Sequence, residues 1–518
     1  MNAQLTLALL PDFVVVVGAL LLLLWSAGKR DDDVDASRTA ALVVVGVCAT
    51  ALVAVGALAW RGTDDLLPRT APIAADNFRW AADAVILVGT ALSALLAGDF
   101  GRRERPISGE AFALMLLSAS GMMLLAGARD LVLVFLGIEL TSIPTYVLAG
   151  LDRRSARSAE AGLKYFLLGA FSTAFLLYGV ALLYGATGST NLVSIGAQVA
   201  NPGPLPQVVF ALGVGFTLVG FAFKVSAAPF HMWTPDVYEG APTPITAFMA
   251  SAVKAGAFAA FARVFLEAFA PVAERWHPVL WWVAVVTMVG GNVVALAQRN
   301  VKRMLAYSSI AHAGYLLVAL VTNTGRGASA IVFYLFAYTL ATVGAFAVIE
   351  ALGGSVAGSK DIDRWSGLFS ARPLLAVAMA VFMLALLGFP LAGGMGFFAK
   401  WYVLQAALGA PAPQTRLAVI LVLASVVSAG YYLYLVAVMF MRRRPADAPA
   451  VPATPAWTGT VVAACAALLL LLGLYPTPAV RWSQAAALRP GGTLVEPMFG
   501  RVDAGPTALV PAAAHAVP

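Results

Sequence analysis

The sequence predicts an all-α polytopic membrane protein with about 14 transmembrane helices, arranged as two inverted five-helix repeats that each contain a discontinuous helix. Hydrophobic residues make up 61% of the 518 residues and charged residues only 11%, whereas charged residues reach about 25% in soluble domains. Apolar runs of about 18 or more residues, the length that spans a bilayer, recur along the chain. These observations exclude a soluble enzyme.

The apolar runs divide the chain into successive spans. The run that follows MNAQLTLALLPDF has no basic residue before it and no cleavage-like sequence after it, so we expect a retained first helix and no signal peptide. Spans are predicted near 9–27, 40–60, 79–98, 110–127, 130–150, 161–185, 206–227, 244–266, 278–297, 303–321, 328–352, 373–406, 416–441 and 457–475. The predicted order is an N-terminal three-helix segment (1–109), the two repeats (110–267 and 268–442), a loop with a C-terminal helix (443–482) and an irregular tail (483–518).

The stretch from Phe221 to Lys254 carries a lysine in each of two apolar runs, with four prolines between them. Each proline removes a backbone donor and clashes with the preceding turn of a helix. Non-helical backbone at membrane depth survives only inside protein or beside water. We therefore expect the helix predicted over about 206–243 to break at residues 226–243, next to a hydrated cavity. The prolines are Pro229, Pro235, Pro242 and Pro244.

A second break is predicted at 386–400, LLGFPLAGGMGFFAK, inside the span 373–406. Pro390 and the glycines after it weaken helix continuity, and Lys400 follows. The two broken helices are five helices apart. Because five is odd, the second must enter the membrane with the opposite orientation. Paired broken helices in an inverted repeat mark the transport site of many membrane transporters.

Basic residues predict the orientation of the chain. With the N-terminus outside, 18 of the 33 Lys and Arg residues fall on one face, 11 on the other and four within spans. The richer face should be cytoplasmic, which places both termini on the non-cytoplasmic side. The net charge of +7 therefore reflects membrane orientation, and no nucleic-acid partner is expected.

Five ionisable side chains are predicted inside the spans: Glu139, Lys164, Lys224, Lys254 and Lys400. Each lysine at mid-membrane depth costs at least ~2.5–3.5 kcal/mol. Glu139 and Lys224 would reduce each other's desolvation cost as a pair. Lys164 lies near the start of its span and could instead extend to the interface. One pair could be architectural, but several such groups on different helices indicate a proton relay.

Two histidines fall in the same regions. His231, in PFHMWTPD, lies in the first break, where its imidazole could bridge the two lysine regions at neutral pH. His312, in SSIAHAGY, lies mid-helix. For each, a packing role and a relay role carry about equal weight.

No cofactor is expected in this chain. The two cysteines, Cys48 and Cys465, are far apart in sequence, and an iron–sulfur cluster needs about four such ligands. The sequence shows no metal-ligand cluster and no catalytic triad pattern, and the LAGGMG glycines lack the strand–turn–helix context of a phosphate site.

Several segments resemble the antiporter-like membrane subunits of bacterial proton-pumping NADH–quinone oxidoreductase, respiratory complex I, over about residues 110–440. The strongest match is PFHMWTPDVYEGAPTP. GIEL, KYFLLGAFSTAFLLYG, SAVKAG, SSIAHAGY and GGMGFFAKWYVL add to it. The subunit N type is favoured, because subunit M typically has glutamate where Lys400 stands and subunit L continues into a lateral helix.

The resemblance implies 14 helices, two inverted repeats and a line of buried charges along the membrane midplane. Glu139 and Lys224 would interact, Lys254 would be the central relay lysine, and Lys164 an accessory group. The implied function is a redox-inactive, proton-translocating subunit in the bacterial plasma membrane. Flavin, iron–sulfur clusters and quinone would belong to partner subunits.

The expected partners are the other membrane subunits of complex I, especially neighbouring antiporter-like and small membrane subunits, together with lipids. Two alternatives remain at this point: a cation/proton antiporter subunit of the multisubunit type, and a purely structural subunit whose lysines only brace helices.

Overall fold

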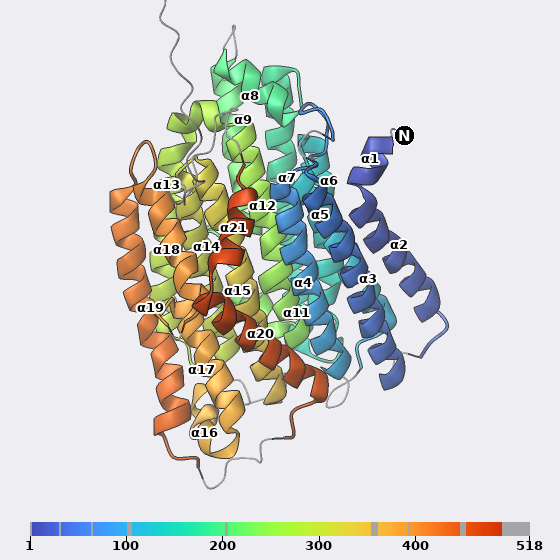
Figure 1. The fold of residues 1–518 in the computed structure, drawn as a ribbon, viewed down its shortest axis with the longest axis vertical. Coiled ribbons are helices and arrows are strands. Elements are labelled where there is room, and N and C mark those ends of the chain that lie inside the picture. The colour runs from blue at the N-terminus through green and yellow to red at the C-terminus, as the bar shows by residue number, and fades with distance from the viewer. Residues whose placement is uncertain are drawn as a thin grey trace, which may run out of the picture.

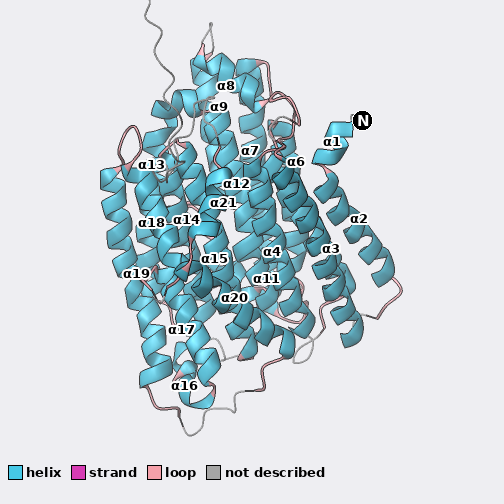
Figure 2. Cartoon of the chain, in the orientation of Figure 1, coloured by secondary structure: helices cyan, strands magenta, loops and turns pink. Residues whose placement is uncertain are grey.

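The computed structural model describes residues 3–30, 33–63, 66–100, 106–201, 206–353, 361–391, 393–445 and 452–488. These residues fold into helices, and the only β pairing among them consists of isolated bridges. Figure 2 shows the helices running side by side in one bundle. The predicted all-α class is confirmed.

Within the described ranges, twelve helical segments are long and apolar enough to cross a membrane. The shorter apolar helix α2 (Leu10–Ser26) and the broken pair α17 (Pro373–Leu387) and α18 (Met395–Leu408) supply the two remaining predicted spans. The twelve are α3 (Val34–Arg61), α4 (Asn77–Phe100), α5 (Gly109–Gly127), α6 (Leu131–Ala149), α7 (Ala156–Thr187), α9 (Gln207–Lys224), Thr243–Glu267, Ala270–Leu296, α14 (Val301–Val321), α15 (Gly325–Ala351), α19 (Thr415–Met441) and α20 (Ala456–Leu474).

The other helical elements are short or belong to composite spans. Thr243–Glu267 consists of α11 (Thr243–Phe248), η1 (Met249–Val253) and α12 (Lys254–Glu267), and Ala270–Leu296 consists of η2 (Ala270–Val272) and α13 (Ala273–Leu296). The short helices are α1 (Ala3–Ala8), α8 (Leu192–Ala200), α10 (Trp233–Gly240), η3 (Ile362–Trp365), α16 (Leu368–Ala371) and α21 (Thr477–Ala485).

The helices differ in how deeply they lie in the bundle. In Figure 1, α2 and α3 form one edge and α19 the opposite edge. The segment from α11 to α12 is 100% buried over its apolar stretch, and α14 and α15 are each 94% buried, against 28% for α20. A charged side chain on α12 or α14 therefore lies inside protein and not against lipid.

The first break follows Lys224, the last residue of α9. The chain then makes turns over residues 225–232 before α10 begins. Pro229 lies in these turns, Pro235 in the first turn of α10, and Pro244 in the first turn of α11. Proline interrupts no helical hydrogen bond at such positions. The predicted discontinuous helix is confirmed, but the predicted interruption also contains α10, which the sequence reading missed.

A π-helical turn, η1, lies directly before Lys254 and joins α11 to α12. Such turns are rare and occur often at functional sites, because the wider turn re-aims the side chains that follow. The sequence reading predicted an ordinary helix here.

The second break lies between α17 and α18. Gly388 ends α17 with a φ of +76° and Gly394 precedes α18 with a φ of +52°, in the left-handed region that favours glycine. A Cβ on Gly473 of α20 would lie 2.2 Å from the Cα of Gly394, so α20 contacts the break backbone to backbone. This break is also confirmed.

The C-terminal end of the described chain is more regular than predicted. The helix α21 runs to Ala485, three residues into the segment expected to be an irregular tail, because Val480 and Ser483 are buried there. The ring of Trp482 packs edge-on against Phe336 of α15, with centroids 5.5 Å apart. The remainder of the predicted tail, 489–518, lies outside the described residues.

Candidate functional site

Lys254 lies in the centre of the bundle and is only 2% exposed. Its Nζ donates hydrogen bonds to the carbonyl of Ser309, at 2.7 Å, and to the Ser309 hydroxyl. The same nitrogen lies 5.4 Å from the ring centroid of Tyr338. The ammonium group of Lys254, which follows the π-helical turn, is thus directed at α14 and α15.

His312 is held through both ring nitrogens. The Tyr334 hydroxyl lies 2.7 Å from Nδ1, and the Tyr432 hydroxyl lies 3.1 Å from Nε2. The Tyr432 hydroxyl also makes a short contact with the Ser308 hydroxyl. A neutral imidazole donates from one nitrogen and accepts at the other, and a tyrosine hydroxyl can serve either.

Lys400, on α18, is 7% exposed. Its Nζ donates to the carbonyl of Leu387, at 2.8 Å, and to the Ser425 hydroxyl, at 3.1 Å. Leu387 is the last residue of α17, so this carbonyl is one that the helix end leaves without an intrahelical partner. Lys400 also lies 4.7 Å from the ring centroid of Tyr315.

These groups form a line of side-chain contacts across the second half of the bundle, from Lys254 through His312 to Lys400, which we call the lysine chain. The His312 ring lies 5.0 Å from that of Tyr338, which Lys254 contacts, and 5.4 Å from that of Tyr315, which Lys400 contacts. Both lysines lie close enough to His312 to interact with it electrostatically. A small cavity is lined by His312, Tyr334, Tyr338 and Lys400 and leaves about 10 Å³ for the centre of a water molecule, which is near the minimum that one water requires.

Lys224 occupies a separate site at the first break. Its Nζ donates to the Ser142 hydroxyl at 2.6 Å and lies 3.4 Å from the Tyr146 hydroxyl. Glu139 lies one turn before Ser142 on α6 and interacts electrostatically with Lys224, but among the described residues the two form no ion pair. Glu139 and Lys224 therefore interact through their charges, while the Ser142 hydroxyl occupies the position next to the ammonium.

A cavity lies beside Lys224 as predicted, but its lining is mainly apolar where a polar, hydrated cavity was expected. Thr141, Ser142 and Tyr165 line it together with apolar side chains, including Val253 of η1, and about 10 Å³ remains for the centre of a water molecule. The cavity connects the first break to the residue next to Lys254.

Two other predicted residues lie apart from both sites. Lys164 has 41% of its side chain exposed and forms ion pairs of 2.7 Å with Glu160 and with Asp236 of α10. His231 is half-buried, and its Nδ1 has no hydrogen-bond partner among the described residues. The bridge from His231 to the lysine regions is not observed.

The tyrosines that lie between His312 and the two lysines were not predicted from the sequence. Tyr315 accepts a hydrogen bond from Asn292, at 2.8 Å, and Asn292 in turn accepts one from Tyr431, at 2.9 Å. A signal was present on α14, where Ser308, His312 and Tyr315 recur at helical spacing on one face. The partners on α15 and α19 show the same spacing, with Tyr334 and Tyr338 on one face of α15 and Ser425, Ser428 and Tyr432 on one face of α19.

Comparison with known proteins identifies the family. The family described as "NADH:quinone oxidoreductase/Mrp antiporter, TM" matches residues 128–439. NADH-quinone oxidoreductase subunit N of Gemmatimonas aurantiaca is 54% identical over 489 residues, covering 92% of this chain and 93% of that protein. The chain belongs to the subunit N family of NADH-quinone oxidoreductases.

Further members of the subunit N family are also similar to this chain. The subunit N of Myxococcus xanthus is 42% identical, with 93% of this chain and 97% of that protein covered. Among solved structures, a chain of respiratory complex I from Thermus thermophilus is 37% identical, with a TM-score of 0.76 over 92% of this chain and 100% of that one.

The Mrp complex from Dietzia contains a chain with a TM-score of 0.79, at 22% identity and 94% coverage of this chain. That similarity shows the shared fold alone. The relatives with the higher identities are subunits of NADH-quinone oxidoreductase, so the alternative of a multisubunit cation/proton antiporter is not favoured.

Proposed function

We propose that this chain is a redox-inactive membrane subunit of bacterial NADH–quinone oxidoreductase that translocates protons, driven by quinone reduction elsewhere in the complex. The observation that carries the proposal is the buried chain from Lys254 through His312 to Lys400. Such groups are costly inside a membrane protein, and a structural role does not require them to be linked from one helix to the next.

The surroundings of the two lysines suit proton transfer. Among the described residues, no carboxylate lies within ion-pair distance of Lys254 or Lys400, and serine hydroxyls and carbonyls hold both nitrogens. Burial without a countercharge makes the ammonium costly, so the neutral amine is accessible as a proton acceptor.

His312 supplies the step between the lysines. A proton accepted at one ring nitrogen can leave from the other, and the hydroxyls of Tyr334 and Tyr432 can reverse their hydrogen bonds by rotation. One water in the cavity at His312 and Lys400 would complete the connection.

At the first break, we propose that Glu139 modulates the charge of Lys224 across Ser142. The face of α6 next to Glu139 is open, because Leu136 and Ile143 are 48% and 57% exposed. An adjacent antiporter-like or small membrane subunit of the complex, or lipid, would cover this face. We further propose that flavin, iron–sulfur clusters and quinone are bound by partner subunits, and that both termini lie on the non-cytoplasmic side.

The proposal is tested with Lys254→Arg in the intact complex, reconstituted in sealed vesicles. Arginine keeps the charge but cannot be deprotonated in proteins, so proton uptake per quinone reduced should fall. The matched control is Lys164→Arg, since Lys164 is half-exposed and paired with two carboxylates, and it should pump near the wild-type level. Normal pumping by an assembled Lys254→Arg complex would contradict the proposed role.

A further inference from the structure

A second group of buried charges lies at the end of the bundle where α4 begins and α12 ends. None of its members belongs to the lysine chain. It joins three arginines and four carboxylates from α2, α4, α12 and the loops before α4 and α6: Arg79, Arg129, Arg263, Asp12, Asp76, Asp83 and Glu267.

Four of these groups neutralise one another. Arg263 donates to Asp76, at 2.7 and 2.8 Å, and to Glu267, at 2.8 Å. Arg129 donates to Asp76 and to Glu267, each at 3.0 Å. Two arginines and two carboxylates thus form a closed, neutral network.

The charges of the remaining three groups, one arginine and two carboxylates, do not cancel. Arg79 donates to Asp12, at 2.5 Å, and to the carbonyl of Ala74, at 2.9 Å, while its Nε lies 3.5 Å from Asp83, beyond hydrogen-bond distance. Asp83 is 0% exposed, and neither of its carboxyl oxygens has a hydrogen-bond partner among the described residues. One cation therefore faces two buried carboxylates, at a site where Gly127 leaves the room that Arg79 fills.

The other helices that contact α4 do not supply the missing cation. Arg61 of α3 and Arg481 of α21 are exposed, Arg326 of α15 reaches Gly409, and Lys254 of α12 binds Ser309. The helices α11, η1 and α20 carry no charged residue. The remaining charged residues on α3, α4, α5 and α15 lie at the opposite ends of these helices: Asp35, Arg38, Asp99, Glu110 and Glu350.

We propose that Asp83 is a proton-binding site: Arg79 pairs with both Asp12 and Asp83, so one of these two carboxyl groups holds a proton. Arginine cannot release its proton, so the excess negative charge of the cluster is neutralised only by a proton on a carboxyl group. The Asp12 side chain is 12% exposed, whereas the Asp83 side chain is fully buried.

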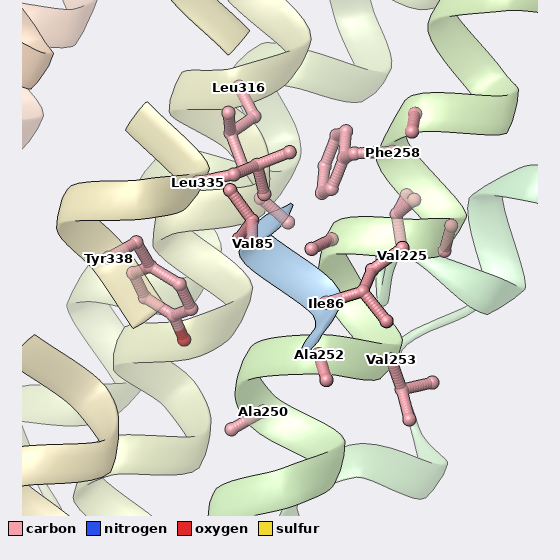
Figure 3. Close-up of a cluster of buried hydrophobic side chains, with 14 of the residues drawn as sticks. Val85, Ile86, Val225, Ala250, Ala252, Val253, Phe258, Leu316, Leu335 and Tyr338 are labelled. Atoms are coloured by element: carbon pink, nitrogen blue, oxygen red, sulfur yellow. The ribbon is translucent and has the colours of Figure 1, made fainter. Parts of the chain in front are cut away.

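The turn of α4 that follows Asp83 packs among apolar side chains. Val85 and Ile86 lie in an apolar cluster with Phe258, Leu316 and Leu335 (Figure 3). None of these side chains can form a hydrogen bond. Tyr338 is drawn in the same cluster in Figure 3, but neither carboxyl oxygen of Asp83 has a hydrogen-bond partner among the described residues.

The test is infrared spectroscopy of the purified complex, which detects the carbonyl band of a protonated carboxylic acid. Asp83→Asn should assemble, because asparagine is neutral like the protonated acid, and should lose one such band. Asp12→Asn should lose the same band, because Arg79 then faces a single carboxylate and Asp83 ionises.

The control is Asp99→Asn on the same helix. Asp99 is buried but accepts hydrogen bonds from its ion-pair partner Arg38 and from the backbone of Trp457 and Thr458, so its substitution should leave the band in place. The band is measured without turnover, so the result does not depend on pumping by the lysine chain. Retention of every wild-type band in Asp83→Asn would overturn the proposal. If that variant fails to assemble, retention of every band in Asp12→Asn would overturn it.

Discussion

At the first break Lys224 is the last residue of its half-helix, whereas at the second break Lys400 lies beyond the non-helical turn, in the half-helix that resumes. Lys224 donates to a side chain, the Ser142 hydroxyl, with Glu139 one turn away. Lys400 donates to the carbonyl of Leu387, at the end of α17, and no carboxylate is paired with it among the described residues.

The difference shows two ways to hold an ammonium group inside a membrane protein. The first break uses a nearby anion, whose effect on the lysine changes when the anion gains or loses a proton. The second break uses the fixed dipole of a helix end, which does not titrate. We therefore expect the first site to be adjusted by neighbouring charge and the second to act as a fixed station of the relay.

The largest effect is expected from His312→Phe, which breaks the chain toward Lys400 and leaves Lys224 with all its contacts. Phenylalanine fills the site but carries no proton, so the rate of proton uptake should fall on the order of tenfold, equivalent to about 1.4 kcal/mol in activation free energy. Assembly should be retained and is checked by native gel electrophoresis.

The control for this variant is Tyr432→Phe, which removes one hydroxyl from the imidazole and keeps the ring packing. It should reduce proton uptake by less than His312→Phe does. Equal uptake by the wild type and by an assembled His312→Phe complex would show that the two lysines do not communicate through the imidazole.

A smaller effect is expected from Glu139→Gln, which removes the anion that only the first break possesses. Losing a favourable charge interaction of about 1 kcal/mol should lower proton uptake roughly fivefold. Because glutamine is nearly isosteric, assembly should survive. The double variant with Lys224→Ala should then be no worse than Lys224→Ala alone. Full pumping by both single variants would remove the proposed modulation.

The smallest effect is expected on stability, from glycine substitution at the second break. Gly388→Ala forces a side chain into a φ of +76° and places its Cβ 2.8 Å from the Lys400 side chain, so the complex should lose about 1–2 kcal/mol of stability. A thermal unfolding scan of the purified complex measures this loss of stability as a lower unfolding temperature.

The matching substitution at the first break is Ser226→Gly, because Ser226 is a non-glycine residue that already adopts a φ of +63°. Ser226→Gly should change stability little, since relief of the backbone offsets loss of the hydrogen bond from Thr234. A larger loss in Ser226→Gly than in Gly388→Ala would contradict this account of the two breaks.

The sequence predicts most of this fold, because apolar run length and proline position are local signals. They locate the spans, both breaks, and Lys254 and Lys400 inside the protein. They do not predict α10 or the π-helical turn before Lys254, since no residue in MASAV differs from ordinary helical sequence.

The site is less predictable than the fold, because its contacts join residues far apart in the chain. His312 meets Tyr432, 120 residues away, and only the tertiary structure brings Ser142 between Glu139 and Lys224. The arginine network was also missed, because Arg263 and Asp76 are 187 residues apart and read as charges at the ends of separate spans.

We propose that Lys400 carries protons and does not merely supply a positive charge. The most direct measurement is proton uptake into vesicles by assembled complexes that carry Lys400→Arg or Lys400→Ala, with quinone reduction measured in parallel. Arginine retains the charge without releasing a proton, and alanine removes both. The account predicts that both variants lose proton uptake. Near-normal uptake by Lys400→Arg together with failure of Lys400→Ala would contradict it, because a fixed cation would then suffice.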